Sequence, residues 1–126
     1  MRIRKMKLID LEVVNNKFSF GKVFNVNTLK SDFIYVAEDK KEIKGILFAD
    51  ATKTGTSILF AIEVLEEYRK NGIAQKMMDK FENDAIKKGI SVVMTFYNNK
   101  EGIERFYEKF NYEIGTNLNT ACKKLI

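Results

Sequence analysis

The stretch RKNGIAQKMM, residues 69–78, carries residue types that could bind an anion. Arg69 and Lys70 supply cations, and an Asn-Gly pair precedes an apolar run with helical spacing. Backbone N–H groups in a turn that leads into a helix converge on one point, where the helix dipole adds roughly half a positive charge. Gly72 allows a close approach of the backbone, and Ala74 keeps the next approach small. Phosphate oxygens fit this arrangement. The alternative interpretation of the same residues is a turn that binds no ligand.

The side chains available for catalysis are limited, because the chain has no histidine and a single cysteine, Cys122. This excludes Ser-His-Asp hydrolysis, Cys-His proteolysis and thiolate-rich zinc sites, and no metal is expected. A catalytic base must then be a carboxylate, a tyrosine, an amine or water. Glu63, the lone charge in the apolar run ILFAIEVL, is the candidate base. The alternative is that Glu63 has no catalytic role and that its carboxylate only points into solvent.

The composition favours one domain over residues 1–126, long enough for one hydrophobic core and too short for two. No run approaches the ~18 consecutive apolar residues of a membrane helix. Asp10 and Glu12 interrupt the apolar start, so a signal peptide is not expected and the protein is predicted to be cytoplasmic. The net charge of +5 comes from scattered lysines, and the aromatic residues fall at core periods. Neither a membrane nor a nucleic acid is therefore expected as a partner.

Four apolar runs are predicted to form the strands that position these residues. FIYVAE (33–38) and GILFAD (45–50) flank a polar connection, which predicts a hairpin. SILFAIEVL (57–65) is nearly continuous, the pattern of a central strand covered on both faces. ISVVMTF (90–96) is a further strand. The anion-binding stretch thus lies directly after the predicted central strand.

A helix is predicted from Ile73 to about Lys88, because its apolar residues recur with a helical period and Gly89 suits a helix end. A second helix has Asn98 or Asn99 as its cap and Asn111 as its left-handed end. Its apolar stripe consists of Ile103, Phe106, Tyr107 and Phe110.

Shorter elements are predicted at both ends of the chain. YEIG (112–115) and TACKKLI (120–126) are two short strands, and IRKMK resembles a strand followed by a short helix in LIDLEVVNN. The strand-helix-strand unit in the middle predicts a parallel strand pair with a right-handed crossover inside an otherwise antiparallel sheet. We therefore predict an α/β (α+β) fold with a mixed sheet, and ligands in such sheets bind beyond the carboxyl ends of parallel strands.

Two spaced motifs resemble the GCN5-related N-acetyltransferase (GNAT) superfamily. VLEEYRKNGIAQKMM is similar to that family's motif A, in which Arg or Gln is followed by two residues, Gly, one residue, and Gly or Ala. Arg69, Gly72 and Ala74 match it, and NNKEGIERFYEKFNYEIG resembles the family's later helix and strand. The resemblance implies a mostly antiparallel sheet of six to seven strands, with a central parallel pair and helices on both faces.

The resemblance also implies acetyl-CoA as the acyl donor. The pyrophosphate-binding residues carried over are Arg69, Lys70, Asn71, Gly72, Ile73, Ala74 and Gln75. The preceding strand usually splays from its neighbour, so backbone groups near Ile62 and Val64 would bind the pantetheine arm and polarise the thioester carbonyl. Asn99 is carried over as a further cofactor contact, beside Lys100, which takes the family's asparagine position.

Tyr107 falls on the tyrosine that protonates the departing thiolate in many members, and it also continues a core stripe. No base is copied from the family, because Thr95 occupies a place where some members have a carboxylate. Proton removal is therefore assigned to Glu63 through water, or to no side chain.

The resemblance predicts an N-acetyltransferase that moves an acetyl group directly to a primary amine. Because an obvious base is missing, a CoA-binding sensor without turnover is the alternative, and a small basic nucleic-acid binder is a third hypothesis. The acceptor is left open among a peptide terminus, a lysine side chain and a polyamine, since the connections that would surround it, about Lys17 to Ser31 and TNLNT, are short. Relatives commonly dimerise through the last strands, which implies a homodimer.

Overall fold

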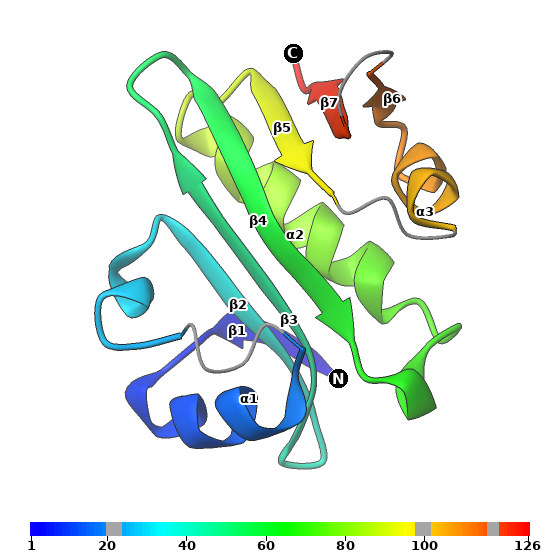
Figure 1. Cartoon of the computed structure of the whole chain (residues 1–126). Coiled ribbons are helices and arrows are strands. Elements are labelled where there is room, and N and C mark those ends of the chain that lie inside the picture. The colour runs from blue at the N-terminus through cyan, green and yellow to red at the C-terminus, as the bar shows by residue number, and fades with distance from the viewer. Residues whose placement is uncertain (20–23, 98–101, 116–118) are drawn as a thin grey trace.

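The computed structural model describes residues 1–19, 24–97, 102–115 and 119–126, and its centre is one mixed β-sheet (Figure 1). The seven strands lie in the order β1-β2-β3-β4-β5-β7-β6. Their bounds are β1 Arg2–Lys5, β2 Phe33–Asp39, β3 Glu42–Ala51, β4 Thr56–Val64, β5 Val92–Phe96, β6 Glu113–Ile114 and β7 Thr120–Lys124. Only β4 and β5 pair in parallel among these strands, and the other neighbours are antiparallel. The predicted mixed, mostly antiparallel sheet with a central parallel pair is confirmed.

Helices cover the sheet on both faces, as predicted (Figure 1). The helical segments are η1 Leu8–Asp10, α1 Leu11–Lys17, η2 Thr28–Lys30, η3 Glu66–Tyr68, α2 Ile73–Lys87 and α3 Ile103–Lys109. The larger core lies under α2 and α3 and includes Phe33, Leu47, Met77 and Phe81. The smaller core lies under α1 and includes Val14, Phe18, Val36 and Ile46. None of the helices in the described residues is both long and apolar enough to cross a membrane.

The α2 and α3 helices end in the way that their sequences indicate. Gly89 follows α2 with a φ of 82°, and the N–H of Ile90 donates to the carbonyl of Ala85 at 2.9 Å. Asn111 follows α3 with a φ of 68°, and the N–H of Tyr112 donates to the carbonyl of Tyr107 at 3.1 Å. Each pattern is a Schellman motif, in which a left-handed residue lets the chain satisfy the last helical carbonyls.

The start of α3 differs from the prediction. The helix begins at Ile103 with Gly102 as its N-cap, at a φ of 83°. The predicted caps, Asn98 and Asn99, lie outside the described residues and do not occupy this position. The apolar stripe alone sets the helix start, because Ile103 is its first member.

The central strand also differs from the prediction of a strand covered on both faces. In β4, Phe60 is 48% exposed, and the register with β3 shifts between Leu59 and Ala61, which pair with Ala49 and Phe48. A bulge of this kind places an extra residue in one strand and changes which face the following side chains occupy. The continuous apolar run therefore contains an exposed aromatic side chain rather than a doubly buried segment.

Candidate active site

The anion-binding stretch forms a turn that ends at the first residue of α2. Lys70 and Gly72 have φ values of 67° and 77°, so two left-handed residues redirect the chain just before Ile73. The first backbone bond of the helix runs from the N–H of Lys76 to the carbonyl of Gly72 at 3.1 Å. The preceding helical N–H groups, from Ile73 to Gln75, have no acceptor within an α-helix. The N-cap is a glycine, whose lack of a side chain leaves these donors open to a ligand.

The charges around this turn also favour an anion. The first turn of α2 contains no acidic residue. The Arg69 side chain is bonded within the turn, because its Nε donates to the carbonyl of Val64 at 2.9 Å and connects the turn to the end of β4. The side chains of Asn71 and Gln75 donate to nearby groups of the same segment, at 3.3 Å to the Tyr68 carbonyl and 2.8 Å to Asp79. Their side chains are therefore engaged within the protein, which leaves their backbone groups for the predicted anion contact, and Lys70 is exposed beside them.

The β4 and β5 strands separate before β4 reaches this turn, as Figure 1 shows. In the described residues they pair only from Thr56 and Val92 to Leu59 and Thr95. The ladder between β3 and β4 continues, and the Leu65 N–H donates to the Lys44 carbonyl at 3.0 Å.

The backbone direction in this part of β4 follows from that ladder. Hydrogen-bonded and non-bonded pairs alternate in an antiparallel ladder, so the polar backbone groups of Glu63 face β3. Those of Ile62 and Val64 face the side from which β5 has diverged. The bond from Arg69 to the Val64 carbonyl agrees with this direction. The gap between the strands is therefore lined by backbone groups of Ile62 and Val64, while their predicted contact with the donor stays a prediction.

Tyr107 reaches the point of separation from α3. Its side chain is buried, and its hydroxyl oxygen lies 3.5 Å from Oγ1 of Thr95, the last residue of β5 that pairs with β4. Thr95 in turn donates to the carbonyl of Leu59 at 2.8 Å. Burial raises the pKa of Tyr107 above its ordinary value, and the Thr95 hydrogen bond opposes this only in part. The hydroxyl is therefore protonated at neutral pH and adjoins the strand gap.

Glu63 lies on the other face of the sheet, beside the segment that follows α1. Its carboxylate accepts hydrogen bonds from the Ser19 backbone N–H at 2.9 and 3.2 Å and from the Ser19 hydroxyl at 3.0 Å. These bonds fix the carboxylate and connect residues far apart in the sequence. In the sequence, Glu63 stands out as a candidate base because it is the lone charge in an apolar run. Nothing in the sequence marks Ser19 as its partner.

Several predicted features fall outside the described residues. Asn99, the further cofactor contact, lies there. So do residues 20–23 and 116–118, which belong to the two connections predicted to surround the acceptor. The structure thus brings together two groups: the turn from Arg69 to Gln75 with the end of β4, and Tyr107 with Thr95 at the strand gap.

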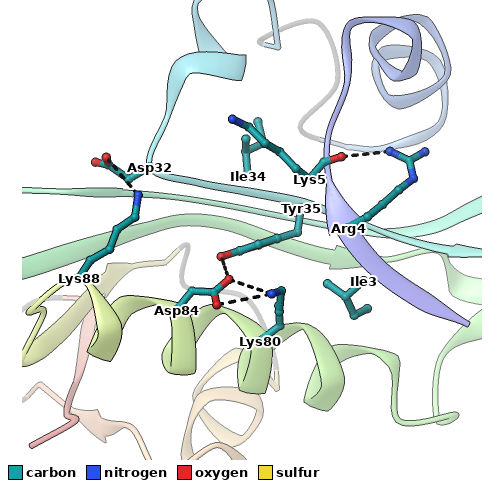
Figure 2. A pocket seen from close by; sticks show the side chains of 9 residues that line it. All are labelled: Ile3, Arg4, Lys5, Asp32, Ile34, Tyr35, Lys80, Asp84 and Lys88. Atoms are coloured by element: carbon teal, nitrogen blue, oxygen red, sulfur yellow. Dashed lines mark hydrogen bonds and ion pairs between the residues drawn. The ribbon is translucent and has the colours of Figure 1, made fainter.

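A polar pocket of about 380 Å³ lies elsewhere, between α2 and the β1 and β2 strands (Figure 2). Several of its polar groups pair with one another: the Tyr35 hydroxyl donates to Asp84 at 2.6 Å, and Lys80 lies 3.3 Å from the same carboxylate. Lys88 lies 3.9 Å from Asp32. Burial and the Asp84 carboxylate raise the pKa of Tyr35. The pocket contains none of the predicted site residues, and these bonds tie β2 to α2.

Comparisons with known proteins agree with this geometry. A family model described as an acetyltransferase (GNAT) domain matches residues 30–114. No curated protein sequence matches the chain. Among solved structures, the fold is similar to that of Ard1 from Thermoplasma volcanium, with a TM-score of 0.84 at 15% identity over 99% of this chain and 97% of that one.

Two further solved structures carry coenzyme A. PaiA N-acetyltransferase from Thermoplasma acidophilum, in complex with coenzyme A, has a TM-score of 0.80 at 15% identity over 98% of both chains. An aminoglycoside 6'-N-acetyltransferase complexed with coenzyme A has a TM-score of 0.83 at 14% identity over 100% of this chain and 98% of that one. At these identities the likeness concerns the fold.

Proposed function

The chain belongs to the GNAT acetyltransferase family, and on this basis we propose that it transfers an acetyl group from acetyl-CoA directly to a primary amine. One observation carries the proposal: a buried tyrosine hydroxyl lies where the parallel pairing stops, β4 continues from there with backbone groups that face away from β3, and an open helix N-terminus follows the end of β4. Each of these features suits a different part of the same donor.

The turn and α2 suit the pyrophosphate of the donor. The N–H groups from Ile73 to Gln75 have no helical acceptor, and the helix dipole favours an anion at this end. A Cβ added to Gly72 would meet no atom within 4 Å, so the backbone here is open to a ligand. Lys70 adds a cation beside the N–H groups of this proposed anion cradle, and Arg69 holds the turn against β4 through Val64. Coenzyme A in two structures of similar fold supports this assignment.

The gap between β4 and β5 suits the pantetheine arm and the thioester. The backbone groups of Ile62 and Val64 face the gap and could bond an amide-containing chain in the manner of a further strand. An N–H group aimed at the thioester carbonyl would stabilise the negative charge that develops on its oxygen during attack. The bound thioester supplies the activated acetyl group, and the protein positions it.

Two side chains would then move protons. As the amine nitrogen forms its bond to the carbonyl carbon and the C–S bond breaks, Tyr107 donates its hydroxyl proton to the leaving sulfur and regains one from solvent. The nitrogen loses its proton through water to Glu63, which Ser19 holds in place. The products are an N-acetylated amine and free CoA thiol, so atoms and charge balance.

A second candidate function is CoA binding without turnover, as in a sensor. It is favoured by one observation: the Glu63 carboxylate already accepts three hydrogen bonds from Ser19, which suits a purely structural role. Titration of CoA by calorimetry, combined with thiol release from acetyl-CoA over a panel of amines, separates the two functions. Binding with amine-dependent thiol release supports the transferase. CoA binding without thiol release in the presence of any of the amines supports the sensor.

A further inference from the structure

Three aromatic side chains lie on the sheet face opposite α2 and α3. Phe48 packs against the smaller core under α1, and the ring of Phe60 stacks on it at 5.0 Å between centroids. Phe96 lies on the same face, because it follows Thr95, whose side chain faces Tyr107 and α3. Phe60 is 48% and Phe96 is 58% exposed. We call these residues, Phe48, Phe60 and Phe96, the aromatic shelf.

The shelf flanks the point where the thioester is proposed to lie. Leu59 and Thr95 form the last parallel pair of β4 and β5, and Phe60 and Phe96 are the next residues of the two strands. Their rings therefore stand on either side of the opening gap. Phe60 is the extra residue of the bulge in β4, and its ring stacks on that of Phe48.

Among the described residues, the two faces of the sheet differ in exposure at this point. On the face of α2 and α3, the side chains of Thr95 and Tyr107 are buried at 1% and 6% exposure. On the opposite face, the exposed rings of the shelf form the surface at the gap. The attacking nitrogen would therefore pass over the shelf, while Tyr107 stands behind the sheet, on the side of the leaving sulfur.

A carboxylate lies on the same face as the shelf. Glu63 pairs with Ile46, a member of the core under α1, and its bonds to Ser19 place its carboxylate there. At ~3.3 Å per residue, Glu63 lies at most about 10 Å along the strand from Phe60. A carboxylate attracts an ammonium group, and exposed aromatic rings favour contact with an apolar substituent, whose burial removes apolar area from water. The surface thus offers the Glu63 carboxylate to the ammonium group of an acceptor and the rings of the aromatic shelf to its substituent.

We propose that Phe60 and Phe96 select, as the acceptor of the proposed acetyl transfer on which this inference rests, a primary amine attached to an aromatic or branched apolar group. Glu63 attracts the ammonium end, and the two rings cover the apolar group at the strand gap. A polyamine would place a second charge against the shelf, where it would lose hydration without an ion-pair partner from Phe60 or Phe96.

The test compares two amines of similar length, phenethylamine and the polar aminoethoxyethanol. Each is titrated by calorimetry into CoA-saturated protein, and each is also assayed as an acetyl acceptor. We expect phenethylamine to bind and react about 10-fold better or more. Phe60→Ala and Phe96→Ala should each reduce this preference several-fold, whereas Ile86→Ala, which removes a 38% exposed apolar side chain from α2, should leave it unchanged.

The outcomes separate this inference from the proposed function. Equal affinity for the two amines, or a preference that survives both phenylalanine substitutions, overturns the selection by the shelf while CoA binding and acetyl transfer stand. A protein that binds no CoA overturns the proposed function and this inference with it. Thermal unfolding of each variant shows whether a lost preference comes from lost folding, and the two single variants give independent readings.

Discussion

The hydroxyl oxygens of Thr95 and Tyr107 lie 3.5 Å apart at the point where β4 and β5 stop pairing. The Thr95 hydroxyl also donates to the Leu59 carbonyl at 2.8 Å, so it adjoins both the last paired residue of β4 and Tyr107. Burial raises the pKa of Tyr107, which keeps its hydroxyl proton in place at neutral pH. A protonated phenol beside the strand gap is suited to donate to a departing thiolate.

Replacing Tyr107 by phenylalanine should lower kcat by about 100-fold or more, because the leaving sulfur loses its proton donor. The affinity for CoA should change little, since the ring and its packing are kept. Tyr112→Phe is the matched control: Tyr112 is also buried and its hydroxyl donates to Glu82 at 3.1 Å, away from the strand gap. Equal losses of kcat in both variants, or none in Tyr107→Phe, would contradict the role of Tyr107.

Replacing Gly72 by alanine should weaken CoA binding by about 10-fold or more, because a Cβ would enter the cradle at the start of α2. Gly89→Ala is the control at the other end of the same helix, with a φ of 82° against 77° for Gly72. Both substitutions should lower the free energy of unfolding by a similar amount, about 1 kcal/mol, from left-handed strain. Calorimetry and urea unfolding separate the two effects, and equal CoA affinity in both variants would count against the cradle.

Replacing Glu63 by glutamine should lower kcat/KM for the amine by about 100-fold and change its dependence on pH, because the proton acceptor is lost. Ser19→Ala should have a much smaller effect, since it removes the hydroxyl bond at 3.0 Å and keeps the two backbone bonds. Steady-state kinetics across pH make the comparison. If the dependence of kcat/KM on pH is the same in Glu63→Gln as in the wild type, the carboxylate has only a structural role.

Replacing Asp10 by asparagine should lower the free energy of unfolding at neutral pH by about 3 kcal/mol, because Arg4 loses a buried partner. Arg4 donates two hydrogen bonds to Asp10, at 2.8 and 2.9 Å, and Asp10 is 5% exposed. Burial raises the pKa of Asp10, but the bonds from Arg4 and from the Lys7 N–H outweigh it, so the pKa lies below its usual range.

The pH dependence of this effect has a definite sign. A lowered native pKa gives stability that is complete above the usual value of about 4 and is lost as the pH falls through the native pKa. Urea unfolding at several pH values should therefore show the wild type and Asp10→Asn converging in acid. The exposed Glu108→Gln is the control and should show a small, pH-independent difference. A gap that persists at low pH would contradict the Asp10 assignment.

The elements with strong local signals could be predicted from the sequence. The apolar stripe gave α2 its start at Ile73, and Gly89 and Asn111 end their helices in the left-handed conformation. The strand boundaries shifted by a few residues, as in β3, which begins at Glu42 after a turn formed by Lys40 and Lys41. Both lysines have positive φ values, of 50° and 66°, a conformation that Asn, Asp and Gly prefer, so the residue types do not indicate this two-residue turn.

The contacts that build the site could not be predicted, because they join residues far apart along the chain. Glu63 and Ser19 are separated by 44 positions, and neither residue type indicates the other. The bulge at Phe60 depends on how β4 pairs with β3, and an apolar run does not reveal a change of face. The bond from Arg69 to Val64 likewise depends on the turn that the two left-handed residues produce.

Mass spectrometry of the products from acetyl-CoA and an amine tests the central claim most directly. The protein is mixed with acetyl-CoA carrying an isotopically labelled acetyl group and with phenethylamine, aminoethoxyethanol and a peptide with a free N-terminus. Labelled N-acetylated amine should appear together with an equal amount of free CoA thiol, and both should fall about 100-fold in Tyr107→Phe. Bound CoA with no labelled amide from any acceptor, or thiol released without amide, would contradict acetyl transfer at this site.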